Sequence, residues 1–325
     1  MKVLGFALLG LVVLACMGAT IIHVKGVPTY AYAPPPEISN LKVPQGDTAL
    51  IERGANIASM MCNQCHLGDD GKLSGMKLGD IPPVFGTIAS LNITRDTLHG
   101  IGSWTDGELY YFLRTGIRKN GSWAPPFMPK YPRIADKDIH AVIAWLRSGD
   151  PRLSPSQREY PPNQWNLFVK ALTNTLPLFQ APPMPAAAIP LPDMADKVAL
   201  GRYLADDLYG CYGCHSGDIL KTDEKEPSRS FGYYGGGIEL TTKEGKPIRT
   251  ANITMDKETG IGNWTEQEFI AAVKYCKKPG GGSLSYPMIP HAALTDYEAS
   301  AIFAFLKTVP VIKNPVQRYQ AAINN

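Results

Sequence analysis

Two pentapeptides carry the residues with the clearest chemistry. Residues 62–66 read Cys-Asn-Gln-Cys-His, and residues 211–215 read Cys-Tyr-Gly-Cys-His. Cys-x-x-Cys-His is typical of covalent haem attachment, because two thiols on one helical turn can reach the two vinyl groups of one porphyrin, and the next histidine faces the iron. A structural zinc site or a redox-active Cys-x-x-Cys explains one such match, but not two with similar downstream segments.

The sequence therefore predicts two covalently attached haem c groups. We expect each motif to supply two thioether bonds and one axial ligand of the iron. The thioether positions are Cys62, Cys65, Cys211 and Cys214, and the axial histidines are His66 and His215.

An internal repeat connects the two motifs to similar downstream segments. Asn-Ile-Thr at 92–94 recurs at 252–254, and Gly-Ile-Gly-x-Trp-Thr at 100–105 recurs at 260–265, both with an offset of 160 residues. The Cys-x-x-Cys-His motifs are offset by only 149 residues, from 62 to 211. The second copy therefore carries eleven extra residues before its Asn-Ile-Thr, which we place in the glycine-rich, charged loop 221–246.

Two methionines at the same repeat position, Met128 and Met288, are the candidates for the sixth iron ligands. A lone methionine is usually core filler, but duplication at one repeat position favours ligation. None of the remaining histidines is duplicated in this way. His/Met coordination raises the reduction potential and fills both axial positions, so it favours electron transfer over catalysis.

Helical periodicity and capping boxes predict a mainly α fold with three helices in each copy. The first helix leads into the haem motif, the second begins at a Thr-x-x-Glu capping box, and the third is amphipathic. Strands are not evident beyond a short hairpin near 231–239. The expected helices are 49–62, one that begins at Thr105, 136–147, 198–209, one that begins at Thr265 and one that begins at Thr295.

The bulk composition narrows the class of protein. The net charge of +3 is too small to indicate a nucleic-acid partner, and 31 glycines with 28 prolines suit short helices joined by long loops. Four of the six cysteines belong to the haem motifs, and Cys16 lies in the apolar N-terminus, so a disulfide framework is not expected. Cys276 is interpreted as a half-buried thiol in a helix.

The N-terminus begins with an uncharged run over residues 3–22 that is long enough to match a bilayer core. We expect an uncleaved transmembrane helix, with a lipoprotein-type cleavage before Cys16 and a simple signal peptide as the alternatives. All three imply export, because haem is attached to Cys-x-x-Cys-His outside the cytoplasm. The expected location is the bacterial inner (cytoplasmic) membrane, with the haem domains on the periplasmic side.

An N-terminal helix that bears the haem motif and packs against a C-terminal amphipathic helix is the c-type cytochrome arrangement. The expected fold is therefore two tandem cytochrome c-type domains behind an N-terminal transmembrane helix. We expect the middle of the connector, around 165–176, to pack across the first domain. The expected divisions are 1–25 membrane anchor or signal, 26–44 proline-rich spacer, 45–150 first domain, 151–194 proline-rich connector, 195–313 second domain and 314–325 C-terminal tail.

Other duplicated side chains have both a functional and a structural interpretation. Trp104 and Trp264 either pack on the haem edge, hydrogen-bond a propionate, or serve as ordinary core residues. A set of cations near the end of the second helix either neutralises propionates, docks an acidic partner, or complements the helix dipole. These cations are Arg114, Arg118 and Lys119 in the first copy, and Lys274, Lys277 and Lys278 in the second.

Together, the Asn-Ile-Thr-x-Asp and Gly-Ile-Gly-x-Trp stretches, the Pro-Met stretch and Cys-x-x-Cys-His resemble the cytochrome c subunits of membrane-bound alcohol and gluconate dehydrogenases. The resemblance covers most of 45–150 and 195–313. It implies electron transfer from a dehydrogenase toward quinone or another acceptor, and it supports the eight proposed haem residues by position. Those subunits typically carry three haems, whereas this chain has two motifs.

The expected function is a membrane-anchored dihaem electron carrier rather than an enzyme, acting within a respiratory or photosynthetic complex. Its expected partners are the membrane and other redox proteins, without nucleic acid. The alternatives are a subunit of a periplasmic dehydrogenase or of a cbb-type terminal oxidase, and a dihaem peroxidase or thiosulfate dehydrogenase. An enzyme of the last kind needs one haem with an open or displaceable sixth site.

Overall fold

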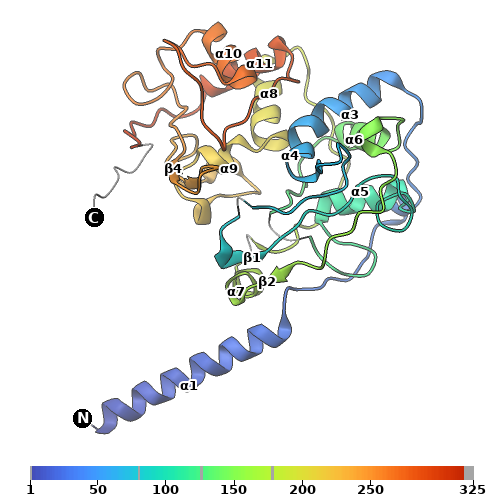
Figure 1. The fold of residues 1–325 in the computed structure, drawn as a ribbon. Coiled ribbons are helices and arrows are strands. Elements are labelled where there is room, and N and C mark those ends of the chain that lie inside the picture. The colour runs from blue at the N-terminus through green and yellow to red at the C-terminus, as the bar shows by residue number, and fades with distance from the viewer. Residues whose placement is uncertain (1, 80, 125–126, 177–178, 318–325) are drawn as a thin grey trace. The chain divides into compact units, whose positions relative to one another are not determined.

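A computed structural model describes residues 2–79, 81–124, 127–176 and 179–317 (Figure 1). Internal contacts divide the chain into two compact units, each assembled from separate stretches of sequence. The second unit contains the first and third helices of the first repeat together with the whole second repeat. The first unit comprises Met1–Val43, Cys65–Pro132 and Gly149–Met184, and the second comprises Pro44–Gln64, Arg133–Ser148 and Pro185–Asn325.

The described residues are mainly helical. Single 3₁₀ turns lie at Pro83–Phe85, Pro151–Leu153, Ile219–Lys221 and Pro227–Arg229. The helices are α1 (Lys2–Lys25), α2 (Pro36–Ser39), α3 (Thr48–Met61), α4 (Asn63–His66), α5 (Asp106–Thr115), α6 (Asp136–Leu146), α7 (Leu167–Thr175), α8 (Lys197–Arg202), η4 (Tyr203–Leu208), α9 (Cys211–His215), α10 (Glu266–Tyr275) and α11 (Asp296–Leu306).

The predicted capping boxes set where three of these helices begin. Thr105 starts α5: its hydroxyl accepts from the Glu108 amide at 3.1 Å, and the Glu108 carboxylate accepts from the Thr105 amide at 2.8 Å. Each pair satisfies two amides that would otherwise lack partners at the helix N-terminus. The same reciprocal arrangement begins α10 at Thr265 and Glu268 and α11 at Thr295 and Glu298.

A glycine lets the first helix of each repeat lie directly against the third. A Cβ atom on Gly54 of α3 would lie 1.9 Å from the Ala141 carbonyl of α6, and one on Gly201 of α8 would lie 1.9 Å from the Ala301 carbonyl of α11. Ala141 and Ala301 differ by the repeat offset. Both contacts lie within the second unit, and Figure 1 shows α3 beside α6 and α8 beside α11.

The second copy departs from the first inside the helix as well as in its long loop. The first motif cysteine follows the packing glycine by eight positions in the first copy, from 54 to 62, and by ten in the second, from 201 to 211. The π-helical segment η4 absorbs part of this difference, because the Tyr209 amide bonds the Leu204 carbonyl five residues back at 2.9 Å. The left-handed Gly210 then starts α9.

Two short antiparallel pairs are the strands of the described residues. β1 (Gly86–Thr87) pairs with β2 (Gln164–Trp165), and β3 (Glu239–Thr241) pairs with β4 (Pro247–Arg249). The hairpin predicted near 231–239 is misplaced, because the observed hairpin of β3 and β4 begins only at the last residue of that range. Two buried tyrosines occupy the earlier position: the hydroxyls of Tyr233 and Tyr234 donate to the Asp206 carboxylate at 2.7 Å, within the second unit.

The middle of the proline-rich connector packs on the first unit, as expected. β2 adds to β1, and α7 follows it with Val169 fully buried. The segment expected to act as a spacer also packs there, because its aromatic residues have partners. Tyr30 meets Trp123 edge to face at 6.0 Å between ring centres, and Tyr32 meets Tyr111 at 5.1 Å.

The expected N-terminal transmembrane helix is a wrong prediction. Among the described residues, no helix combines the length and the apolar character that a bilayer crossing requires.

A buried ion cluster links helices of both repeats inside the second unit. The Arg53 guanidinium of α3 donates to the Asp138 carboxylate of α6 at 2.9 and 3.0 Å, and to the Glu298 carboxylate of α11 at 2.5 Å. The Tyr203 hydroxyl also donates to Asp138, at 2.7 Å. The carboxylate side chains are only 2% and 8% exposed, so Arg53 is a shared cation for two carboxylates that are largely shielded from water.

Replacing Arg53 should destabilise the fold strongly. Arg53→Leu leaves two buried carboxylates without their cation, which costs about 3–5 kcal/mol of unfolding free energy. Arg202→Leu is the matched control, because Arg202 is 56% exposed and its pair with Asp207 is 3.4 Å long, so it should cost less than about 1 kcal/mol. Urea denaturation followed by circular dichroism measures both. Equal losses in the two variants would contradict the role of the cluster.

Candidate functional site

The first motif continues directly from α3 into α4. Cys62 is the residue that follows α3, and the Cys65 thiol lies one turn further along. The backbone therefore presents two thiols at a spacing of three residues and a histidine in the next position. In the second copy the whole motif forms α9, from Cys211 to His215.

Both motif histidines are held through the same ring nitrogen. The Nδ1 atom of His66 lies 2.7 Å from the Leu91 carbonyl oxygen, and that of His215 lies 2.9 Å from the Ala251 carbonyl oxygen. A carbonyl can only accept, so Nδ1 carries the proton and Nε2 carries the lone pair that a metal ion needs. Leu91 and Ala251 differ by the repeat offset and directly precede the two Asn-Ile-Thr segments.

The backbone of each histidine is fixed as well. The His66 carbonyl accepts from the Gly75 amide at 2.9 Å, and the His215 carbonyl accepts from the Gly236 amide at 2.7 Å. Both glycines have positive φ, +88° and +69°. Burial lowers the pKa of His66, against the opposing effect of its bond to Leu91, and so favours the neutral imidazole that binds metals.

The Cys211 thiol of the second motif does not have the environment of a redox-active cysteine. Burial raises the pKa of Cys211 to about 12, whereas a reactive Cys-x-x-Cys needs a lowered pKa to form a thiolate. All six cysteines lie within the described residues, and none of them forms a disulfide. In the same part of the chain, no three Cys, His, Asp or Glu side chains converge on one point as a structural zinc site requires.

The residues present fit a covalently bound haem. Each motif supplies two thiols on one turn and an imidazole whose Nδ1 is engaged. Two of the four buried polar side-chain atoms that lack a hydrogen-bond partner among the described residues lie at the motifs: Asn63 Oδ1 in the first motif and Ser216 Oγ directly after the second. Buried polar atoms normally have partners, so these two mark places that the protein alone leaves incomplete.

Met128 and Met288 occupy equivalent places in their repeats. Each is half-buried in a bend directly after a turn, and each lies in the same unit as its histidine. The Cys276 thiol donates to the Met288 carbonyl at 3.8 Å. Cys276 ends α10 in a left-handed conformation rather than continuing the helix, and it is buried.

The duplicated cations have different environments. Arg114 is fully buried and donates to the Tyr131 carbonyl at 2.8 Å, while Lys274 is paired with Asp296 at 2.5 Å. Lys119 is paired with Glu108 at 3.0 Å. These three side chains therefore have structural partners within their own units.

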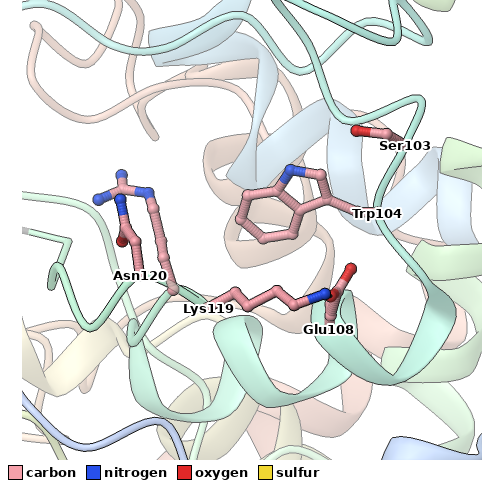
Figure 2. Close-up of a pocket in the computed structure, with 6 residues that line it drawn as sticks. Ser103, Trp104, Glu108, Lys119 and Asn120 are labelled. Carbon is pink, nitrogen blue, oxygen red and sulfur yellow. The ribbon is translucent and has the colours of Figure 1, made fainter.

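A cavity of about 440 Å³ lies beside Trp104 in the first unit. The Trp104 ring meets Phe112 edge to face at 5.4 Å, and the Arg118 guanidinium lies 5.3 Å from the same Phe112 ring. Arg118 donates to the Ser122 hydroxyl at 3.2 Å, and burial lowers its pKa. Figure 2 shows Trp104 above the Lys119–Glu108 pair; the lining residues are Ser103, Trp104, Glu108, Arg118, Lys119 and Asn120.

The sequence motifs alone did not reveal what holds the histidines. The Leu91 and Ala251 carbonyls and the Gly75 and Gly236 amides are backbone groups, which sequence chemistry does not single out. The duplicated Asn-Ile-Thr was visible, but only as a marker of the repeat. The sequence signal that could have identified the two accepting carbonyls is that each belongs to the residue directly before an Asn-Ile-Thr segment.

Comparison with known proteins supports a cytochrome. Residues 49–146 match the family described as cytochrome C oxidase, cbb3-type, subunit III. The chain is 29% identical to the alcohol dehydrogenase (quinone) cytochrome c subunit of Gluconobacter oxydans over 82% of this chain and 56% of that protein. It is 30% identical to the fructose dehydrogenase cytochrome subunit of Gluconobacter japonicus over 80% of this chain and 52% of that protein.

A further relative is closer in length. The diheme cytochrome c-type protein of Cereibacter sphaeroides is 27% identical over 78% of this chain and 83% of that protein. By contrast, the chain spans only slightly more than half the length of the dehydrogenase subunits that it matches. The chain therefore carries a cytochrome c family domain and is related to cytochrome c subunits of dehydrogenases, which are electron-transfer subunits and not the catalytic ones.

Gly75 should be indispensable for the backbone that holds His66. In Gly75→Ala, the new Cβ would lie 2.5 Å from the Ser90 carbonyl oxygen at a φ of +88°. Strain of this kind costs about 1–3 kcal/mol. Gly79→Ala is the control, because nothing lies within 4 Å of its Cβ position. Thermal unfolding should show a lower midpoint for the first variant alone; equal midpoints would contradict the close approach.

Proposed function

We propose that this relative of dehydrogenase cytochrome c subunits carries two haem c groups and transfers electrons as a subunit or partner of a larger redox complex. The observation that carries the proposal is the duplicated site, in which a Cys-x-x-Cys-His histidine donates through Nδ1 to a backbone carbonyl. A histidine ring bonded to a carbonyl is common in proteins, but its recurrence in the same motif at the same repeat position indicates a common ligand.

Each residue of the proposed sites has a distinct task. Cys62 and Cys65 hold the first haem through thioethers, and Cys211 and Cys214 hold the second. When bound, the haem supplies one-electron chemistry at its iron. The histidines would hold the iron through Nε2 while Nδ1 keeps the ring in one orientation. Met128 and Met288 would each supply a thioether sulfur as a further ligand.

Filled axial positions favour electron transfer over catalysis. A haem with histidine and methionine ligands has no open site for peroxide or oxygen, and methionine raises its reduction potential. A dihaem peroxidase would instead need one iron with a displaceable ligand.

The relatives suggest the kind of partner. Two of them are named as the cytochrome subunits of a quinone-dependent alcohol dehydrogenase and of a fructose dehydrogenase. We propose a partner dehydrogenase or another redox subunit for this chain. The haem-bearing part would lie on the periplasmic side, because haem is attached to Cys-x-x-Cys-His outside the cytoplasm.

A second candidate is a subunit of a cbb3-type oxidase, which the family match over residues 49–146 favours. The match covers the first copy only, whereas the similarity to the dehydrogenase subunits extends over about four-fifths of the chain. Purification of the native complex separates the two candidates. Haem-copper subunits in stoichiometric amounts would favour the oxidase, and a dehydrogenase subunit would favour the first proposal.

The methionines are tested by replacing each with leucine, which keeps size and apolarity but removes the sulfur. Met128→Leu and Met288→Leu should each reduce the methionine–iron charge-transfer band to about half, and the double variant should abolish it. Met76→Leu and Met255→Leu are the controls, because neither methionine is duplicated.

Haem content is measured in every variant first, and two haems per chain are expected throughout. A full band in both single variants would refute the ligand assignment while leaving the haem attachment intact. Fewer than two haems in the wild-type protein would refute the proposed cofactor content itself.

A further inference from the structure

The two Asn-Ile-Thr segments have the same hydrogen-bonded structure in both units. In the first, Asn92 Oδ1 accepts from the Thr94 amide at 2.9 Å and from the Thr94 hydroxyl at 2.7 Å. In the second, Asn252 Oδ1 accepts from the Thr254 amide at 3.0 Å and from its hydroxyl at 2.8 Å. Each asparagine thus closes a tight turn immediately after the carbonyl that receives the histidine proton.

The amide nitrogen of each asparagine ties this turn to the segment that follows the third helix. Asn92 Nδ2 donates to the carbonyls of Ser156 and Arg158 at 2.7 and 3.0 Å. The asparagine is 6% exposed, so these bonds are shielded from water. Two donors and two accepted bonds use the full hydrogen-bonding capacity of the side chain.

In the second copy, the asparagine makes equivalent bonds to partners of different sequence. Asn252 Nδ2 donates to the Ile312 carbonyl at 2.7 Å and to the Thr259 hydroxyl at 3.0 Å, and Asn252 is 3% exposed. The Thr254 hydroxyl adds a bond from the Ile312 amide at 3.2 Å. The second copy therefore keeps the same turn, although the groups that accept from the asparagine amide differ. We expect this result if the turn is needed to place the carbonyl that precedes it.

We propose that Asn92 and Asn252 are positioning residues that hold the Leu91 and Ala251 carbonyls against the histidine Nδ1 atoms and thereby set the reduction potential of each haem. This inference rests on the proposed function. A firm hydrogen bond at Nδ1 makes the imidazole a stronger electron donor, and a stronger donor stabilises the oxidised iron. Loosening the carbonyl should therefore raise the potential.

The alternative is a purely structural role, in which the asparagines close a loop and affect stability alone. A stability measurement cannot separate the two roles, because both predict destabilised variants. A measurement of the reduction potential can separate the two roles, because a turn that merely closes a loop has no effect on the electron density of the histidine. The two copies also act as internal references, because each asparagine should affect one haem only.

The test uses Asn92→Ala and Asn252→Ala in the full-length haem-loaded protein. Potentiometric titration should show one haem shifted to higher potential in each variant, and a different haem in the two variants. The expected shift is about tenfold in the ratio of reduced to oxidised haem at fixed potential, which is ~59 mV for one electron. Asn174→Ala is the matched control, because its amide bonds the Gly26 and Lys170 carbonyls away from the histidine turn.

Two results would overturn the inference. One is a pair of variants that keep both haems and lose thermal stability while neither potential moves. The other is fast hydrogen exchange in the wild-type protein, a measurement that stays decisive if a variant does not fold. In nuclear magnetic resonance spectra, the ring Nδ1–H signals of both histidines should exchange slowly with deuterium. Fast exchange would contradict a fixed carbonyl. Absence of haem from the wild-type protein would instead count against the proposed function.

Discussion

The structure depends most on a hydrogen bond between a histidine ring and a backbone carbonyl. That bond occurs once in each repeat, at 2.7 Å for His66 and 2.9 Å for His215. It leaves Nε2 as the ring nitrogen with a free lone pair and gives the imidazole a defined orientation. Glycine amides on the histidine backbone and asparagine turns behind the carbonyls complete the arrangement.

The two sites are similar at the histidine and different elsewhere. The second copy has a π-helical turn before its motif and a longer loop after it. That loop places Tyr233 and Tyr234 on the buried Asp206 carboxylate, for which the first copy has no counterpart at the equivalent helix position. Insertions in duplicated domains thus lie around the site rather than within the contacts that orient the ligand.

Much of this organisation followed from the sequence, because it depends on local patterns. The capping boxes at Thr105, Thr265 and Thr295 fixed where helices begin, and the apolar periodicity identified α6 and α11. Features set by distant partners did not follow. The hairpin was misplaced because the Tyr233 hydroxyl donates a hydrogen bond to Asp206. The segment around Tyr30, which was expected to be a spacer, packs on Trp123. The expected transmembrane helix was wrong, and the histidine-holding carbonyls carry no side-chain signal.

The Arg53 cluster joins the two copies through one buried interaction. Its cation belongs to the first copy, while its carboxylates belong to one helix of each copy, Asp138 and Glu298. Without the first copy, the Glu298 carboxylate would lose its cation, and without the second, Arg53 would lose one of its two carboxylates. A substitution at any of these three residues therefore affects the packing of helices from both copies.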